Sequence, residues 1–342
     1  MSATTDQTGV GLGTEWALGP LTLPNRLVLA PLAGIGNWCV RLQAKRFGAG
    51  LVVSEMVSSH AIHHRNAKTM REMLRVHPDE HSGGGTVSVQ LFGADPDVME
   101  SAAEQVAAAG ADVIDLNMGC PVPKVCKTGA GAALLRDPDR AVALARAAGR
   151  GSGLPVTVKL RPGQRPGDRD GVALAIRLAE EAGVAAISMH PRHASQAHRG
   201  RPDYDLAREV AEAIGVPFIL SGGLRPTREE VLTAWERARP TAIMLARGSL
   251  GNPWLFADLL GTRGDPPTHP APDEVLTELT WLMDRVEEHM GTERGGRWLR
   301  KAYPWYVERL GGGAELQDEL QRAEGLGAAR RILAREPPAL VG

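Results

Sequence analysis

The arrangement of apolar residues along the chain limits its fold most strongly. Short apolar runs alternate with alanine-rich segments in which apolar residues recur at helical spacing. The runs lie at 26–31, 50–56, 85–93, 111–119, 155–163, 184–192, 216–224 and 241–249. Strands that alternate with helices form a parallel sheet, and eight such units over roughly 230–250 residues predict an α/β fold, the closed (β/α)8 TIM barrel. After the second run, residues 57–84 form a long, elaborated loop region instead of a clear helix.

Composition changes divide the chain into four parts. Residues 1–15 are polar and glycine-rich, which predicts a flexible tail, and the barrel occupies residues 16–260. The "GVGLG" of the tail imitates part of a dinucleotide fingerprint, but no strand precedes it. A proline- and glycine-rich linker follows at 261–274, and residues 275–342 form a small C-terminal helical domain.

Charge and cysteine content exclude several classes of protein. The formal net charge is -1, so a nucleic acid would have to bind a local basic patch rather than a globally basic surface. Three cysteines, Cys39, Cys120 and Cys126, have no metal-binding spacing and indicate a reduced, cytoplasmic protein. The N-terminus has no signal-peptide pattern and no apolar run reaches membrane-spanning length. We expect a monomer without a metal centre and without a membrane anchor.

Polar residues gather at the C-terminal ends of the predicted strands, where barrels of this class carry their sites. The residues at these ends are Glu55, Gln90, Asn117, Cys120, Lys159, Arg161, His190 and Arg192. Polar groups are costly to bury without partners, so their convergence predicts a polar site.

The last two strand ends indicate a phosphate site. Ser221, Gly222 and Gly223 follow the seventh predicted strand, while Ala246 and Arg247 end the eighth. Glycines let the backbone approach a phosphate, and an arginine can bind its oxygens. A simple tight turn is the alternative for the glycines, but the neighbouring arginine favours phosphate.

Several motifs together resemble one family. "APLAG", "VSVQLFG", "DLNMGCPVPKV", "GAALL", "VTVKLRPG", "SGGL" and "ARGSLGNPW" are similar in order to the tRNA-dihydrouridine synthases, most closely the bacterial B-type branch, over roughly residues 20–310. Two segments depart from the family pattern. Asn37 stands where the family usually has an aspartate near the pocket, and the loop Pro191–Gly200 replaces the usual sequence after the sixth strand.

The resemblance implies an FMN-containing TIM barrel that uses NADPH to reduce a uridine of tRNA to dihydrouridine. It implies that FMN is held by Pro31, Leu32, Ala33, Gln90, Lys159, His190, Ser221, Gly222, Gly223, Ala246 and Arg247. Lysine beside a flavin can stabilise negative charge near N1, and His190 would lie over the ring. Asn117 matches the asparagine that contacts uracil, and Arg161 and Arg192 match a positively charged rim near the substrate.

Cys120 matches the catalytic acid of this family, and the chemistry agrees. Hydride from FMN N5 adds at uracil C6, and C5 must then receive a proton. A thiol with a pKa near 8.5 is protonated at neutral pH and can donate it. The alternative is a structural cysteine, the role that we assign to Cys39 and Cys126 as packing residues.

The helical domain carries the predicted RNA contact. Arg297, Arg300 and Lys301 fall near one helical face, interleaved with aromatic residues that could stack on bases or pack inside. Three alternatives remain open: reduction of a free pyrimidine, as in dihydroorotate dehydrogenases; modification of another RNA; and RNA binding without catalysis. The helical domain argues against a small substrate, and the retained Cys120 and Lys159 argue against loss of catalysis.

Overall fold

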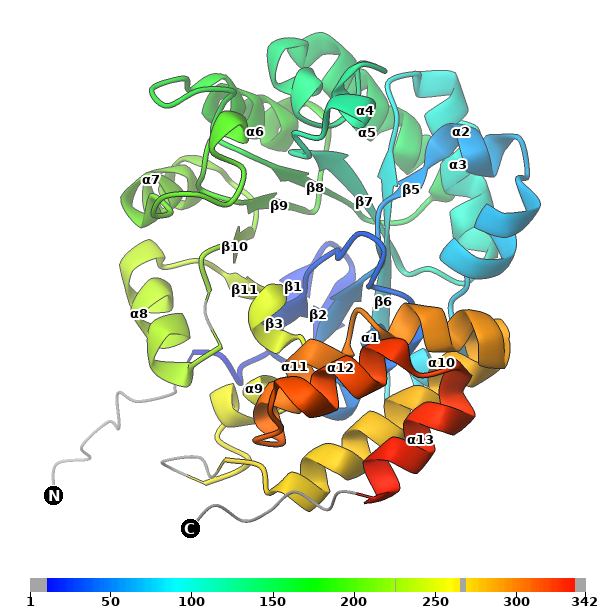
Figure 1. Ribbon diagram of the computed structural model, residues 1–342. Coiled ribbons are helices and arrows are strands. Elements are labelled where there is room, and N and C mark those ends of the chain that lie inside the picture. The colour runs from blue at the N-terminus through cyan, green and yellow to red at the C-terminus, as the bar shows by residue number, and fades with distance from the viewer. Residues whose placement is uncertain (1–10, 225, 265–268, 336–342) are drawn as a thin grey trace, which may run out of the picture.

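The computed structural model describes residues 11–224, 226–264 and 269–335. Eight parallel strands form the barrel: β3 (Leu27–Leu29), β4 (Leu51–Val53), β6 (Thr86–Phe92), β7 (Val113–Met118), β8 (Val156–Leu160), β9 (Ala186–Met189), β10 (Phe218–Ser221) and β11 (Ala242–Leu245). The order is β4-β3-β11-β10-β9-β8-β7-β6, and pairing of β4 with β6 closes the ring. The predicted (β/α)8 barrel is confirmed (Figure 1).

Helices surround the strands on the outside. They are α1 (Trp38–Arg46), α3 (Pro96–Ala108), α5 (Pro138–Ser152), α6 (Asp170–Glu181), α7 (Tyr204–Ala213), α8 (Arg228–Ala238) and α9 (Trp254–Leu259). Their starts follow from local sequence: Asp95 and Asp137 cap α3 and α5 by accepting backbone N–H groups, and a proline opens each helix. The main apolar core lies between these helices and the strands.

The segment after β4 is built of short elements in place of one barrel helix. It contains β5 (Val57–Ser58), α2 (Ser59–His63), a π turn at Thr69–Met73 and a 3₁₀ turn at Pro78–His81. A buried ion pair of Arg41 with Glu80, 2.7 Å long, fastens it to α1, and both side chains are at most 1% exposed. Charge pairing at this depth offsets the desolvation of both groups.

An antiparallel hairpin of β1 (Trp16–Leu18) and β2 (Leu21–Leu23) closes the N-terminal end of the barrel. Its buried side chains join those that point into the barrel from the strands. The pattern of apolar residues did not predict this hairpin. Residues 11–15, expected in the flexible tail, also lie against the barrel, because Leu12 is 1% exposed and its carbonyl accepts the N–H of Arg26. Residues 1–10 of that tail lie outside the described residues.

The C-terminal helices pack on the barrel beside α1 (Figure 1). They are α10 (Pro272–Leu299), α11 (Tyr303–Arg309), α12 (Ala314–Arg322) and α13 (Gly325–Arg335). Gly291, with φ 76° and ψ 169°, interrupts α10. Gln43 of α1 donates to Glu278 at 2.8 Å and to the hydroxyl of Tyr306 at 2.9 Å, so buried hydrogen bonds join the two domains.

Among the described helices, none has the length and apolar character needed to cross a bilayer.

Candidate active site

A cavity of about 950 Å³ opens at the C-terminal ends of the barrel strands. Its size is typical of small-molecule and cofactor sites. Fifteen of the residues that the sequence selected line it: Pro31, Leu32, Ala33, Gln90, Asn117, Cys120, Lys159, Arg161, His190, Arg192, Ser221, Gly222, Gly223, Ala246 and Arg247. They come together because all eight strands run parallel and end at the same side of the ring.

The loops after β10 and β11 form an anion cradle. Gly222 and Gly223 have φ of +86° and +77°, and a Cβ on Gly222 would lie 2.0 Å from the ring of His190. Within the described part of the chain, nothing accepts a hydrogen bond from either glycine N–H. Arg247, at the start of a 3₁₀ turn (Arg247–Ser249), is exposed beside them. Free N–H donors next to a guanidinium suit a phosphate.

Lys159 and His190 both line the cavity but differ in charge, because the lysine is cationic and the histidine is neutral at neutral pH. Burial, with a contribution from nearby Arg161, lowers the pKa of Lys159 to about 8. Burial and the cations Lys159, Arg161 and Arg192 hold the pKa of His190 far below its usual range. Nη1 of Arg192 donates to Nε2 of His190 at 3.1 Å, so the neutral imidazole carries its proton on Nδ1.

The Cys120 loop is fixed through its backbone. Oδ1 of Asn117 accepts the N–H groups of Gly119 and Cys120 at 3.3 and 2.9 Å. The carbonyl of Cys120 accepts from the N–H of Ala132 at 2.9 Å and from the thiol of Cys126 at 3.3 Å. Burial raises the pKa of the Cys120 thiol, so it is protonated at neutral pH. The thiol thus faces the cavity on a loop that cannot swing freely.

The other two cysteines do not line the cavity. Cys39 is buried in α1, where its thiol donates to the carbonyl of Arg285 at 3.3 Å, and Cys126 lies behind the Cys120 loop. Their places agree with packing roles.

Arg161 and Arg192 lie deeper than a rim would. They are 5% and 8% exposed. Nη1 of Arg161 donates to the carbonyls of Arg192, His193 and Ala197, and Arg192 donates through Nε and Nη2 to the carbonyl of Gly200. The two guanidinium groups therefore hold up the loop 193–200 from below. These backbone partners cannot be recognised from the sequence pattern.

Asn37 has a structural place that explains its departure from the family pattern. Its Oδ1 accepts the N–H groups of Cys39 and Val40 at 3.1 and 3.3 Å, which makes it the N-cap of α1. It is 5% exposed and does not line the cavity. Aspartate and asparagine cap helices about equally well, so this exchange changes the cap and not the cavity wall.

Arg297, Arg300 and Lys301 lie outside the cavity lining, and each has a partner. Arg297 pairs with Glu293, Arg300 donates to the carbonyl of Ala323, and Nζ of Lys301 donates to the carbonyl of Gly34 at 3.0 Å. Gly34 belongs to the loop after β3, and its N–H donates to Glu55 at 2.8 Å. Lys301 therefore ties the helical domain to the cavity rim.

Of the two possibilities left open for the aromatic residues near these cations, inward packing applies to the two tyrosines. Tyr303 and Tyr306 are each 1% exposed. Trp305 is partly buried and lines the cavity, so the helical domain contributes directly to the site.

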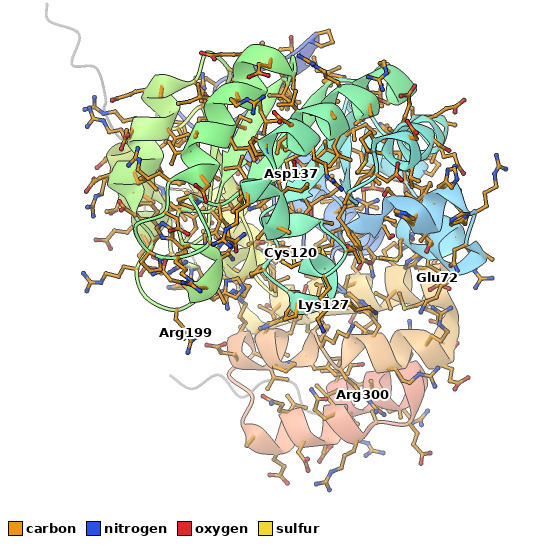
Figure 2. The ribbon with its side chains drawn as sticks, turned by 90° about the horizontal axis from the view of Figure 1, so that it is seen from above. Glu72, Cys120, Lys127, Asp137, Arg199 and Arg300 are labelled. Atoms are coloured by element: carbon orange, nitrogen blue, oxygen red, sulfur yellow. The ribbon has the colours of Figure 1, made fainter. Side chains whose placement is uncertain are left out.

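Exposed cations that the sequence pattern did not select lie in or next to two segments that line the cavity. They are Lys124 and Lys127 at the short helix α4 (Pro123–Cys126), and Arg199 and Arg201 in the loop before α7. No described residue forms an ion pair or a side-chain hydrogen bond with any of them. In Figure 2, Lys127 and Arg199 lie on the side of the barrel toward which the helical domain projects. Val122, next to them, is 48% exposed.

Asp115 is another residue that the sequence analysis missed. It is 1% exposed and hydrogen-bonds Gln90 beneath the cavity. The available signal was an acidic residue within the apolar run "VIDLNM", two positions before Asn117 and therefore on the same strand face.

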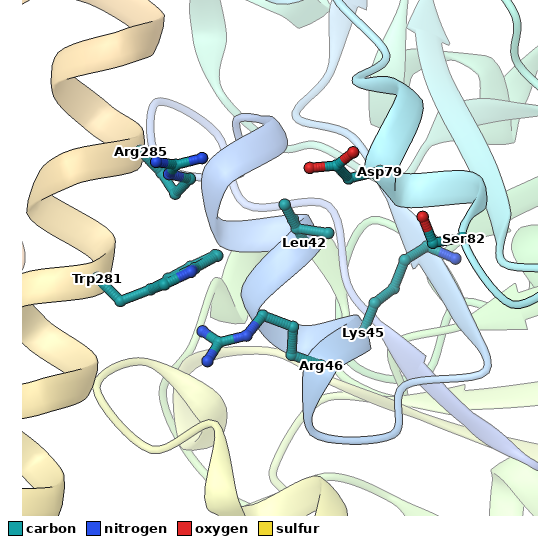
Figure 3. Close-up of a pocket in the computed structure, with 7 residues that line it drawn as sticks. All are labelled: Leu42, Lys45, Arg46, Asp79, Ser82, Trp281 and Arg285. Carbon is teal, nitrogen blue, oxygen red and sulfur yellow. The ribbon is translucent and has the colours of Figure 1, made fainter.

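A second hollow, of about 370 Å³, lies away from this cavity at the seam of α1 and α10 (Figure 3). The guanidinium of Arg46 stacks on the ring of Trp281 at 4.0 Å and pairs with Glu278 at 2.8 Å. These contacts hold the helical domain on the barrel. No group of three or more His, Cys, Asp or Glu side chains suited to a metal ion occurs among the described residues.

Comparison with known sequences identifies similar proteins. A model of the family described as dihydrouridine synthase (Dus) matches residues 28–336. The tRNA-dihydrouridine synthase B of Pseudomonas aeruginosa is 35% identical over 310 residues, which cover 90% of this chain and 91% of that protein. A probable tRNA-dihydrouridine synthase of Rickettsia prowazekii is 34% identical over 302 residues, covering 88% and 90%.

Solved structures share the architecture. An old yellow enzyme homologue from Zymomonas mobilis has a TM-score of 0.55 at 16% identity, covering 78% of this chain and 96% of that one. Morphinone reductase has a TM-score of 0.56 at 16% identity, covering 79% and 94%. At such identities the likeness concerns the barrel fold alone.

Proposed function

Because this chain belongs to the dihydrouridine synthase family, we propose that it is an FMN-dependent oxidoreductase that reduces specific uridines of tRNA to 5,6-dihydrouridine with NADPH. One observation carries the proposal most directly. Cys120, with a protonated thiol, lines a cavity that also contains the cradle of Gly222, Gly223 and Arg247, which suits a phosphate, and the partly buried Lys159. We also propose a cytoplasmic location, since tRNA is a cytoplasmic substrate and the three cysteines form no disulfide.

The cavity residues fit FMN. The cradle offers unengaged N–H groups and a guanidinium to the phosphate, and a side chain on Gly222 would collide with His190. Lys159 lines the cavity, and no described residue accepts a hydrogen bond from its ammonium, so it would be available to stabilise a flavin ring that gains negative charge on reduction. When bound, FMN would supply the hydride that adds at uracil C6.

Cys120 would donate the proton to uracil C5. Its raised pKa keeps the thiol protonated, and the bonds of Asn117 and Ala132 to its backbone hold it at one place above the cavity floor. Positioned general acids contribute about 10²–10⁴-fold to rate.

The exposed cations support RNA as the substrate. A uracil must leave its stack to enter the cavity, so its phosphates must be held outside. Lys124, Lys127 and Arg199 are exposed next to residues that line the cavity and can bind these phosphates. On the other side of the cavity, the helical domain adds Trp305 to its lining and carries Arg297, Arg300 and Lys301.

The test is reduction of unmodified tRNA by the purified protein with NADPH or NADH, followed by mass spectrometry of the nucleosides. We expect released FMN from the yellow preparation and dihydrouridine in the RNA. Release of FAD would contradict the cofactor. Reduction of a free pyrimidine or of another RNA, with none of tRNA, would favour those substrates instead.

A further inference from the structure

We propose that Asp115 is a positioning residue: its carboxylate sets the orientation of the Gln90 and Asn117 amides and thereby the place of the Cys120 loop. The proposal rests on the proposed function for its catalytic consequence. Its structural claim, that Asp115 determines which way the two amides point, does not depend on the reaction.

Strand register brings the members together. On β7, Val113, Asp115 and Asn117 alternate with Ile114, Leu116 and Met118. Val113 belongs to the apolar cluster inside the barrel, so Asp115 and Asn117 also point inward. Asp115 pairs in register with Gln90 of β6 on one side and with Thr157 of β8 on the other. The three side chains therefore lie in one layer below the cavity.

An ionised carboxylate can only accept hydrogen bonds. Asp115 therefore determines the orientation of the Gln90 amide, and Gln90 in turn determines that of the Asn117 amide. The two oxygens of Asp115 accept from the hydroxyl of Thr157 and from Nε2 of Gln90, both at 2.6 Å. Gln90 must therefore turn its oxygen the other way, where it accepts from Nδ2 of Asn117 at 2.9 Å. Asn117 then presents Oδ1 to the N–H groups of Gly119 and Cys120.

Without the carboxylate of Asp115, no group that can only accept hydrogen bonds determines which way the Gln90 amide points. An amide has a donor and an acceptor of nearly equal shape, so Gln90 could reverse. Asn117 would then turn its nitrogen toward the Cys120 loop, where two N–H donors would face another donor. Such a clash of donors leaves buried groups unsatisfied and loosens the loop.

The competing explanation is that Asp115 acts only through its negative charge. Lys159, on the next strand, is the charged group that acts on Asp115, and burial raises the pKa of Asp115 to about 6. If Asp115 served only to balance the charge of Lys159, Asp115→Asn would be as harmful as Asp115→Ala. Orientation predicts otherwise, because asparagine can still accept from Gln90 while it donates to Thr157.

A double-mutant cycle with Thr157 separates the two explanations. In the asparagine variant, the hydroxyl of Thr157 is the acceptor that keeps the new amide in the required orientation. We therefore expect Thr157→Val alone and Asp115→Asn alone to be mild. Their combination frees the amide to reverse and should approach Asp115→Ala, so the two effects are not additive. Charge balance predicts no such coupling.

Two measurements report the result. The first is alkylation of Cys120 by iodoacetamide, followed by peptide mass spectrometry with buried Cys39 as internal reference. It requires no turnover, and a loosened loop should react several-fold faster in Asp115→Ala and in the double variant. The second is flavin reoxidation by tRNA, which should slow by roughly 10–100-fold in the same two variants, a range typical for groups that orient a functional residue.

Three outcomes would overturn the proposal. They are unchanged alkylation and reoxidation in Asp115→Ala, an asparagine variant as impaired as the alanine variant, and strictly additive effects in the cycle. If Asp115→Ala does not fold, the asparagine variant, Thr157→Val and their combination still decide. If the wild-type protein does not reduce tRNA, the proposed function fails, while the alkylation measurements still test the orientation.

Discussion

At the scale of single residues, the site combines a thiol kept protonated with an imidazole kept neutral. Burial acts in the same sense on both, because it disfavours the charged form: the pKa of Cys120 rises and that of His190 falls. The site therefore holds a proton on sulfur while its positive charge resides on Lys159, the two buried arginines and Arg247.

Cys120→Ala should separate the two half-reactions. FMN binding and flavin reduction by NADPH should be unchanged, because neither needs a proton at uracil C5. Reoxidation by tRNA should slow by about 10²–10⁴-fold. Stopped-flow flavin absorbance measures both steps. Cys126→Ala and Cys39→Ala serve as controls, and reoxidation of Cys120→Ala at the wild-type rate would rule out the general acid.

Gly222→Ala should lose the cofactor. The new Cβ would lie 2.0 Å from the His190 ring, at a φ of +86°. The backbone conformation alone costs about 1–2 kcal/mol for a residue with a side chain. We expect weaker FMN binding in a fluorescence titration and a lower free energy of unfolding in urea. Gly215→Ala is the matched control, since its Cβ would meet no atom within 4 Å; equal FMN affinity of both variants would contradict the cradle.

At the scale of elements, short loops do more than the long helices to define the site. The four-residue helix α4 presents two lysines beside the Cys120 loop, and the loop 193–200 is held by the carbonyl contacts of Arg161 and Arg192. Neither segment has an extensive apolar core of its own. The loop is placed by hydrogen bonds from the two buried arginines, whereas α4 is anchored by its buried Val125.

Replacement of both Lys124 and Lys127 by alanine should weaken tRNA binding and flatten its salt dependence. Each phosphate contact contributes a slope of about 0.7–0.9 in log K against log salt, so the loss of two contacts should lower the slope by about 1.4–1.8. Titrations at several salt concentrations measure it, with flavin reduction by NADPH unchanged. Arg150→Ala with Arg208→Ala, on α5 and α7, removes the same charge far from the mouth; an equal effect of that pair would show that net charge alone matters.

The same titration applied to Arg297→Ala, Arg300→Ala and Lys301→Ala together tests the helical domain. Weaker binding with a lower salt slope is expected there as well. An unaltered slope would show that these cations serve their intramolecular partners only.

At the scale of the whole molecule, ion pairs and hydrogen bonds keep the helical domain on the barrel. Arg294 of α10 pairs with Glu72 in the segment after β4, and this pairing lowers the pKa of Glu72 to about 2. A carboxyl whose pKa is depressed on folding stabilises the folded state above its unfolded pKa, near 4.3, and loses this contribution as the pH falls toward the folded value.

Glu72→Gln should therefore lower the melting temperature slightly at pH 7, in keeping with about 0.2–1 kcal/mol for a partly exposed pair. The difference between variant and wild type should shrink as the pH falls from about 4.3 toward 2, where the wild-type carboxyl becomes protonated. Calorimetry over this pH range measures it. A difference independent of pH would contradict the ion pair.

The sequence alone determined the barrel and the residues that the strand ends contribute to its cavity. Strand and helix periods are local properties, and parallel strands in a closed ring must end together, so Gln90, Lys159 and Cys120 had to meet. Tertiary structure alone decided the partners. Arg161 reaches loop carbonyls more than thirty positions away, Lys301 binds Gly34 across 267 positions, and Asp115 meets Gln90 only through the register of two strands. Such pairings depend on which carbonyls and amides folding brings within hydrogen-bond distance, and residue type and spacing along the chain do not contain that distance.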